Sequence, residues 1–301
     1  MNLKIGTRGS KLALWQANKV KDLLAAGGIS AELVLIKTTG DKEQIKPLHQ
    51  IGQTGLFTKA LDDALMNGEI DLAVHSSKDM PSSVPAGLEL VAFLQREDPR
   101  DVLLAVDPDV DLDNFSRKIV LGTSSLRRQA LVKHYLPNCE LKLIRGNVDT
   151  RVAKMRGGEY DGILLAYAGV KRMGMTDLVR RKLNVNTFTP AVGQGAIAVA
   201  GRAEDVQSKR VREILNHRET ELAVEAERAF LRTLEGGCQT PIFALATVMG
   251  DTMSMQGGLA SVDGTVVMRE KVEGHADSGA ALGVQLANTL INQGATEILN
   301  G

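Results

Sequence analysis

The sequence predicts an α/β protein with two open, largely parallel sheets, followed by a small α+β domain. Over residues 3–182, short apolar segments alternate with amphipathic ones, which is the βαβ pattern of parallel sheets. Two polar segments that contain proline, residues 96–101 and 187–195, interrupt this alternation. From residue 243 onward, short apolar segments are separated by Gly-Asp and Asp-Gly turns, which is typical of antiparallel strands.

The first α/β unit begins with a short apolar strand at residues 3–6 that enters a glycine-rich turn. Ser10 stands where a helix N-cap belongs, because apolar residues at helical spacing follow it over residues 12–24. A Gly-Gly pair at residues 27–28 ends that helix. The remaining elements expected in this unit are a strand at 31–37, a helix at 55–66 and a strand at 70–75.

The second α/β unit lies between the two interruptions, which we interpret as the outward and return crossovers between two domains, because proline cannot continue a helix or a central strand. Its expected elements are strands at 119–121, 141–144 and 162–165, helices at 125–135 and 150–156, and helical material around 170–182. A helix at 219–234 and a joint at 235–241 lead to the small domain. That domain is expected to contain strands at 243–248, 252–259 and 265–272 and a helix at 278–292.

Composition excludes several classes of function. The 301 residues include no apolar run long enough to span a membrane, and the N-terminal residues carry scattered lysines instead of the apolar core of a secretory signal. We therefore expect a cytoplasmic protein that has no membrane partner. The two cysteines, Cys139 and Cys238, and five scattered histidines predict neither a disulfide framework nor a metal site.

The formal net charge of zero argues against bulk binding of nucleic acid, but it conceals an uneven distribution. Residues 42–113 carry 6 basic and 14 acidic side chains, whereas residues 117–182 carry 15 basic and 5 acidic ones. Ordinary solvated helix faces would explain such an imbalance. The positions of the arginines favour a ligand instead.

Residues 122–128 place a hydroxyl-rich turn between a strand and a helix whose first turn contains Arg127 and Arg128. Backbone N–H groups, hydroxyl donors and the positive end of the helix dipole converge there, which suits a carboxylate or phosphate. Because the dipole disfavours arginine at that end, stability alone does not explain the pair. The alternative is a capped surface helix with two solvated arginines.

Other strand ends repeat this arrangement. Arg145 and Arg151 flank one turn, Lys171 and Arg172 follow another, and Arg8 lies beside Ser10 in the first domain. The carboxyl ends of parallel strands meet at one edge of a sheet, so these side chains should face a common crevice. Several guanidinium groups in one crevice indicate a ligand with several carboxylates or phosphates.

Two further residues are candidates for chemistry. Asp79 follows a strand end among these cations, where an ionised carboxylate could hold developing positive charge or transfer protons; the alternative is an Asp that caps a turn before Pro81. Cys238 occupies a Gly-Gly loop, where a thiol could be a nucleophile or a covalent attachment point, although no histidine in the segment could act as its base. We interpret Cys139 as structural.

In this order, these segments resemble the porphobilinogen deaminase family over nearly the whole chain. The segments at family motifs are residues 6–8, 55–59, 75–81, 96–101, 122–128, 145–151, 191–195 and 234–241. The resemblance implies two α/β domains like those of type II periplasmic binding proteins, joined by two crossovers, and a C-terminal α+β domain. The implied domains are residues 1–95 with 196–214, residues 100–190 with 218–235, and residues 239–301.

The resemblance also implies a transferase of tetrapyrrole and heme biosynthesis that acts as a monomer. Its cofactor would be dipyrromethane, held by a thioether to Cys238. Four molecules of the substrate porphobilinogen would add head to tail, each releasing ammonia, and hydrolysis would free hydroxymethylbilane while the cofactor stays attached.

Since every ring of cofactor and substrate carries an acetate and a propionate, many fixed cations are needed. By family position, the residues implied to bind cofactor or substrate are Arg8, Ser10, Gln16, Lys59, Ser76, Lys78, Thr123, Ser125, Arg127, Arg128, Arg145, Gly146, Asn147, Arg151, Arg172, Gln194 and Gly195. Asp79 matches the catalytic carboxylate. We expect it to accept hydrogen bonds from pyrrole N–H groups, to stabilise the azafulvene cation left by ammonia loss, and to assist transfer of the departing ring proton.

One segment departs from the family. Residues 52–55 read Gly-Gln-Thr-Gly where the family usually has Gly-Gly-Lys-Gly, so Thr54 replaces a lysine in a stretch, residues 41–54, that resembles the family's mobile loop over the active site. Lys42 and Lys46 are the candidates to compensate for that charge.

Two rival functions explain the sequence less completely. A solute-binding protein or ligand-sensing domain of the same architecture would use the anion-binding turns equally well, but it leaves Asp79 and Cys238 unexplained. A nucleotide-phosphate enzyme would need a Gly-x-x-x-x-Gly-Lys loop, which the sequence lacks.

Overall fold

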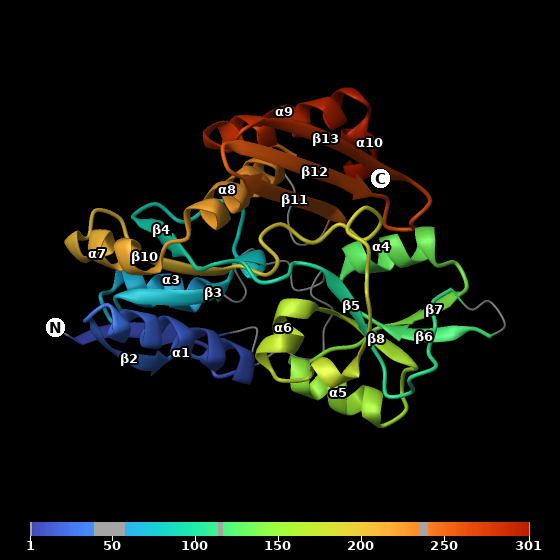
Figure 1. Cartoon of the computed structure of the whole chain (residues 1–301), viewed down its shortest axis with the longest axis horizontal. Coiled ribbons are helices and arrows are strands. Elements are labelled where there is room, and N and C mark those ends of the chain that lie inside the picture. The colour runs from blue at the N-terminus through green and yellow to red at the C-terminus, as the bar shows by residue number, and fades with distance from the viewer. Residues whose placement is uncertain (1, 39–57, 114–116, 235–239, 301) are drawn as a thin grey trace.

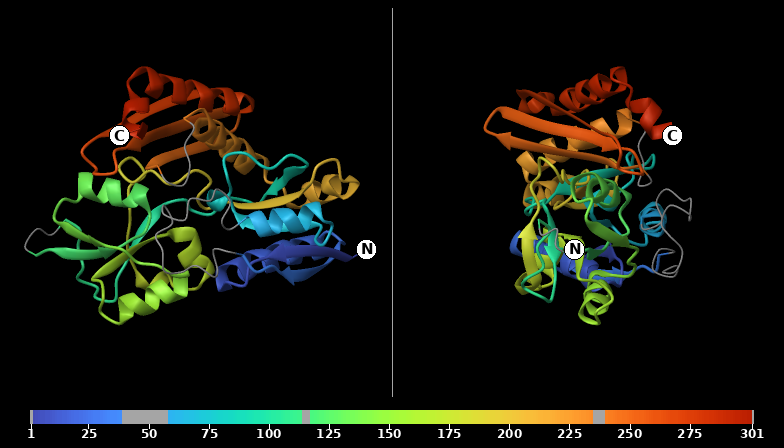
Figure 2. Two further views of the ribbon diagram at one scale, coloured as in Figure 1. Left: turned by 180° about the vertical axis from the view of Figure 1, so that it is seen from behind. Right: turned by 90° about the vertical axis from the view of Figure 1, so that its right-hand side faces the viewer.

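The computed structural model describes residues 2–38, 58–113, 117–234 and 240–300. In this part of the chain, two five-stranded sheets lie side by side, and a three-stranded sheet with its helices lies across both (Figures 1 and 2). The fold class expected from the sequence, two α/β domains plus a small C-terminal α+β domain, is confirmed. None of the described helices is both long and apolar enough to span a bilayer.

The first sheet has the strand order β2-β1-β3-β10-β4. Its strands are β1 (Asn2–Thr7), β2 (Ser30–Leu35), β3 (Leu72–Ser76), β4 (Leu88–Phe93) and β10 (Ile197–Arg202), and its helices are α1 (Lys11–Ala26), α3 (Lys59–Met66), α7 (Val206–Leu215) and the short 3₁₀ helix η2 (Ser77–Asp79). Strand β1 pairs in parallel with β2 and β3, whereas β10 pairs antiparallel with β3 and β4. The first domain is therefore completed only when the chain returns from the second.

The second sheet has the order β7-β6-β8-β5-β9 and the same plan. Its strands are β5 (Asp101–Leu104), β6 (Ile119–Gly122), β7 (Cys139–Lys142), β8 (Gly162–Ala166) and β9 (Val179–Lys182), and its helices are α4 (Leu126–Tyr135), α5 (Val148–Arg156), α6 (Tyr167–Arg172) and the 3₁₀ helix η3 (Thr176–Leu178). Strand β5, which enters from the first crossover, runs antiparallel to both β8 and β9. Each sheet thus contains one antiparallel strand adjacent to a crossover.

The third sheet, β11-β12-β13, is antiparallel throughout. It comprises β11 (Ile242–Met249), β12 (Thr252–Ala260) and β13 (Val267–His275), and the helices beside it are α8 (Arg218–Thr233), α9 (Gly279–Asn292), α10 (Ala295–Asn300) and the 3₁₀ helix η4 (Ala276–Ser278). Phe230 of α8 and Leu286 of α9 pack over Gly257 of β12, where a Cβ would lie 2.8 Å from the Phe230 ring. Glycine is needed there because helix and sheet approach so closely.

Strands β4, β5 and β10 and helix α7 were not predicted from the sequence, and some predicted elements have other bounds or another type. The helical material expected around residues 170–182 is present in α6 and in η3, but the prediction is wrong for Val179–Lys182, which form the edge strand β9. The charged side chains of β9 lie at the edge of the sheet, where Arg181 and Asp113 form an ion pair of 2.7 Å. Charges at a sheet edge disfavour pairing with a further strand. Strand β7 begins two residues earlier than predicted, because pairing with β6 sets Cys139 opposite Ile119. Of the helix expected at 55–66, the described part begins at Lys59.

Glu227 of α8 joins the two crossovers to the third domain. Its carboxylate is fully buried; it pairs with Arg96 of the first crossover at 2.6 Å and accepts the Gly193 N–H of the return crossover at 2.7 Å. It also accepts the Ala246 N–H of β11 at 2.9 Å. One side chain therefore fixes three chain segments that come together only in the folded protein.

Candidate active site

A cavity of about 270 Å³ lies between the two α/β domains, beyond the ends of β1, β3 and β8. From the first domain, the sequence-predicted residues that line it are Arg8, Ser10, Gln16, Ser76, Lys78 and Asp79. From the second domain they are Arg128, Arg145, Gly146, Asn147, Arg151 and Arg172, and Gly195 of the return crossover completes the wall. Six cations predicted from the sequence, contributed by both domains, thus surround one space that the Asp79 side chain also lines.

The first-domain wall follows from two strand ends. Gly6 is the next-to-last residue of β1, at a point where a Cβ would collide with Ile70 Cδ1. The Ser10 side chain accepts a hydrogen bond from Ala13 N as the N-cap of α1. This confirms the N-cap predicted for Ser10 and starts α1 at the cavity. Gln16 of α1 then donates to the Ser76 hydroxyl at 2.9 Å, which fixes the end of β3 immediately before η2.

The short helix η2 carries Lys78 and Asp79 into the cavity wall. Lys78 Nζ lies 3.4 Å from Gln194 Oε1. Burial, and next the charge of Arg128, lowers the pKa of Lys78 from its ordinary 10.5 to about 8, although the charge of Asp79 acts in the opposite direction. The ammonium group is therefore held in the cavity at an energetic cost that a bound anion would relieve.

The second-domain wall is built at the start of α5 and the end of α6. Gly146 has φ of 114°, which only glycine adopts readily, and its carbonyl accepts from Arg151 Nε at 2.7 Å. Arg172 of α6 donates to the Gly195 carbonyl at 2.6 Å, and its guanidinium lies 5.7 Å from the centre of the Trp15 ring. Burial lowers the pKa of both Arg151 and Arg172 to about 10, so both remain charged near neutral pH.

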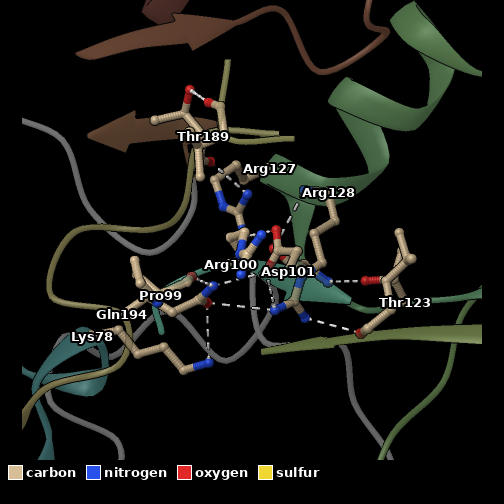
Figure 3. Close-up of polar contacts among 12 residues, drawn as sticks. Lys78, Pro99, Arg100, Asp101, Thr123, Arg127, Arg128, Thr189 and Gln194 are labelled. Carbon is tan, nitrogen blue, oxygen red and sulfur yellow. Dashed lines mark hydrogen bonds and ion pairs between the residues drawn. The ribbon is translucent and has the colours of Figure 1, made fainter. Parts of the chain in front are cut away.

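Asp101, the first residue of β5, is fully buried between Arg127 and Arg128 (Figure 3). Its Oδ2 lies 2.7 Å from Arg127 Nη2, and its Oδ1 lies 2.7 Å from Arg128 Nη2 and 2.8 Å from Gln194 Nε2. Burial alone would raise the pKa of Asp101, but the two arginine charges and the hydrogen bonds from Arg128 and Gln194 hold it well below its usual range. Asp101 is therefore an anion that offsets two buried cations.

The arginine pair of α4 is not solvated. Arg127 and Arg128 are each 5% exposed, so the alternative of a capped surface helix with two solvated arginines is wrong. Arg128 lines the cavity and donates to the Leu164 carbonyl of β8 at 3.0 Å. Arg127 lies outside the cavity wall and donates instead to the Thr189 carbonyl of the return crossover at 2.8 Å.

Other predicted residues also lie outside the cavity wall. Ser125 caps α4 by accepting from Arg128 N, and its own N–H bonds the Thr123 hydroxyl, so both order the turn that presents Arg128. Gln194 bridges Asp101 and the Pro99 carbonyl, and Lys59 begins α3. Cys238 and residues 41–54, including Thr54, lie outside the described residues.

Sequence reasoning missed four residues of the site. Asp101 was assigned to a polar crossover, and no local pattern marks it as the partner of arginines that lie 26 and 27 residues further along the chain. Lys11 and Asp149 line the cavity and form an ion pair of 3.5 Å across the two domains. His75 also lines it; burial, and next the charge of Arg8, lowers its pKa to about 4, which makes it neutral at pH 7.

Comparison with known proteins assigns the chain to a family. The model of the "Porphobilinogen deaminase, dipyromethane cofactor binding domain" matches residues 3–210, and that of the "Porphobilinogen deaminase, C-terminal domain" matches residues 221–292. A porphobilinogen deaminase of Desulfosudis oleivorans is 44% identical over 99% of this chain and 97% of that protein, and one of Trichlorobacter lovleyi is 46% identical over 99% and 95%. The chain belongs to the porphobilinogen deaminase family.

Solved structures of other function share only part of this deaminase-family architecture. The second substrate-binding domain of a putative amino acid ABC transporter from Streptococcus pneumoniae is 12% identical, with a TM-score of 0.43 over 76% of this chain and 93% of that one. The VFT2 domain of Bordetella pertussis BvgS, in a double mutant, is 15% identical, with a TM-score of 0.42 over 71% of this chain and 85% of that one. These likenesses concern the fold and do not bear on what this deaminase-family chain binds.

Removing the Asp101 charge should destabilise this deaminase-family chain strongly. In Asp101→Asn, two buried guanidinium groups lose their carboxylate, which typically costs about 3–5 kcal/mol. Urea unfolding followed by circular dichroism measures the loss. Asp113→Asn is the matched control: it breaks the exposed pair with Arg181 and should cost less than about 1 kcal/mol. Equal losses in the two variants would contradict the role assigned to Asp101.

Lys78 should titrate near pH 8 in protein without cofactor. Because the pKa is lowered, the strain of a buried ammonium is fully present below about pH 8 and is relieved as the pH rises toward the ordinary pKa of 10.5. ¹⁵N NMR of the lysine Nζ in cofactor-free protein measures this titration, and the loss of one signal in Lys78→Arg assigns it. Asp79→Asn should shift the titration to lower pH, because it removes the charge that raises this pKa; an upward shift would show that the two groups do not interact as the structure indicates.

Proposed function

We propose that this chain condenses four porphobilinogen molecules, one at a time, onto a covalently held dipyrromethane, with release of four ammonia molecules, and that water then frees hydroxymethylbilane. One observation supports this most directly: six of the cations predicted from the sequence, contributed by two domains, surround a single cavity that Asp79 also lines. Each ring of the growing chain carries two carboxylates, and guanidinium groups bind carboxylates through paired hydrogen bonds. Family membership supplies the identity of the substrate.

The residues present fit a dipyrromethane. Its two rings carry four carboxylates, and the cavity wall contains several guanidinium groups. Burial lowers the pKa values of Arg151 and Arg172, which means that their positive charges are unfavourable without a bound anion. A bound carboxylate would relieve this strain. Arg8, Arg145, Arg151 and Arg172 are the proposed carboxylate ligands, with Lys78, Ser10 and Asn147 beside them. When bound, the cofactor supplies the pyrrole carbon to which the first substrate unit adds.

Asp79 is the proposed catalytic residue. When ammonia leaves porphobilinogen with the electron pair of the C–N bond, the substrate becomes a cation, and the Asp79 carboxylate stabilises that positive charge where the six cations would oppose it. The pyrrole ring carbon that attacks this cation forms the new C–C bond and then loses its proton, and Asp79 assists that transfer. The neutral His75 adds no further positive charge to this wall.

Cys238 is the proposed attachment point of the cofactor through a thioether. It follows α8 by a few residues, and α8 is fixed to both crossovers through Glu227. Cys139 is a poor candidate for this role, because burial raises the pKa of its thiol to about 11 and disfavours the thiolate. We also propose that the protein acts as a monomer in the cytoplasm, as the family resemblance implies.

The cofactor should be visible in the mass of the intact protein. We expect the native chain to exceed its sequence mass by two pyrrole units, and Cys238→Ser to lack this increment because it lacks the sulfur that forms the thioether. Cys139→Ser, the matched control, should keep it. An active native protein with no added mass would refute covalent attachment.

Replacing Asp79 should impair turnover without loss of the cofactor. Asp79→Asn should fold, retain the two-ring mass increment and convert porphobilinogen about 10²–10⁴-fold more slowly, the usual contribution of a catalytic acid or base. Single-turnover measurements of ammonia release test this. Asp149→Asn, which removes another carboxylate of the same wall, should reduce the rate far less; equal rates in both variants would remove Asp79 from the role proposed.

A further inference from the structure

A second cavity, of about 380 Å³, lies between the first domain and helices α8 and α9, outside the cationic cleft. One side is apolar and includes Leu90 and Phe93 of β4. The other side presents Arg228 and Arg232, one turn apart on α8, together with the Glu225 side chain. The cavity therefore combines an apolar surface, two cations and a single carboxylate.

The two arginines have no carboxylate within ion-pair distance in the described part of the chain. Both donate to one neutral acceptor, the Ser82 carbonyl, at 3.1 Å from Arg228 and 3.4 Å from Arg232. Arg228 is only 5% exposed; its burial, and next the charge of Arg232, lowers its pKa to about 10. Among the described residues Glu225 forms no ion pair with either arginine, although its charge raises the pKa of Arg228; burial raises the pKa of Glu225 itself. Like charges one helical turn apart repel each other, so a bound anion would stabilise this arrangement.

We propose that this cavity binds a small planar organic acid, with its carboxylate on Arg228 and Arg232 and its ring against Leu90 and Phe93. A guanidinium pair provides several N–H donors at fixed geometry for a carboxylate. The apolar side distinguishes a ring compound from an inorganic anion, and Glu225 can accept a hydrogen bond from a ring N–H. A pyrrole carboxylic acid meets all three conditions.

The position of this site connects it with both segments that the proposed function requires. Ser82 lies three residues after Asp79, and α8 ends at Thr233, five residues before Cys238. A bound ligand carboxylate that draws Arg232 away would break its hydrogen bond to the Ser82 carbonyl, and Ser82 belongs to the segment just after Asp79. The binding site itself does not depend on the proposed function; only the choice of a pyrrole as probe rests on it.

The test is calorimetric titration of the full-length chain with pyrrole-3,4-dicarboxylate, which has no aminomethyl group and so cannot be turned over. An Arg151→Gln background weakens binding in the cationic cleft, so that the second site is measured. In that background, Arg232→Gln should weaken binding at least tenfold, which corresponds to about 1.4 kcal/mol. Arg210→Gln, which removes an exposed arginine paired with Glu213 on α7, is the charge-matched control and should leave binding unchanged.

Two results would overturn the proposal. Identical isotherms for Arg232→Gln and Arg210→Gln would show that the arginine pair does not bind the probe. Inorganic phosphate that competes with equal affinity would show that the apolar side contributes nothing and that the site is not one for a ring compound. Since no turnover is measured, either result leaves the proposed function standing, and failure of the proposed function appears separately as a missing mass increment.

Discussion

The ion pairs of Asp101 with Arg127 and Arg128 are the interaction on which the cationic cleft depends. The carboxylate is fully buried and both arginines nearly so, at the positive end of α4, where the helix dipole disfavours further positive charge. Removing ions from water costs several kcal/mol each, and only close pairing with additional hydrogen bonds offsets that cost. Gln194 and the Leu164 carbonyl supply those bonds, so Arg128 is held rigidly in the cavity wall. Fixed cations of this kind need no reorganisation when a carboxylate arrives.

A second buried carboxylate, Glu227, fixes the crossovers between the two domains. It holds Arg96 of the first crossover and Gly193 of the return crossover, while Arg96 Nε also donates to the Gln194 carbonyl at 2.9 Å. Gln194 belongs to the Asp101 cluster as well, through its side chain. The two charge clusters are therefore connected through one residue of the return crossover. Buried polar contacts at the two crossovers therefore connect the two α/β domains beside the cleft.

The sequence predicts the parts of this protein that depend on local pattern. The Ser10 N-cap, the helices at strand ends and the clustering of Arg145, Arg151 and Arg172 follow from spacing and from the shared edge of a parallel sheet. Residues and strands that come into contact only because of the sheet topology cannot be predicted from local pattern. Asp101 lies 93 residues from Gln194, and β9 forms only because β5 offers an edge to pair with, so neither has a signal in its own segment.

The lowered pKa values in the cleft indicate how its affinity arises. Lys78 and Arg151 are each buried near Arg128, and burial and that repulsion both favour loss of their protons. In the protein without a bound anion, this strain lowers the stability of the folded state. The strain is greatest at a pH below the lowered pKa values, where Lys78 and Arg151 are both charged. A bound polycarboxylate offsets the repulsion among these cations and is itself attracted to them. Part of its binding free energy is therefore relief of the strain that folding imposes on the cations. Because only the folded chain assembles these cations, such a ligand stabilises the fold as it binds. A cofactor that stays attached through every cycle would keep that stabilisation permanently.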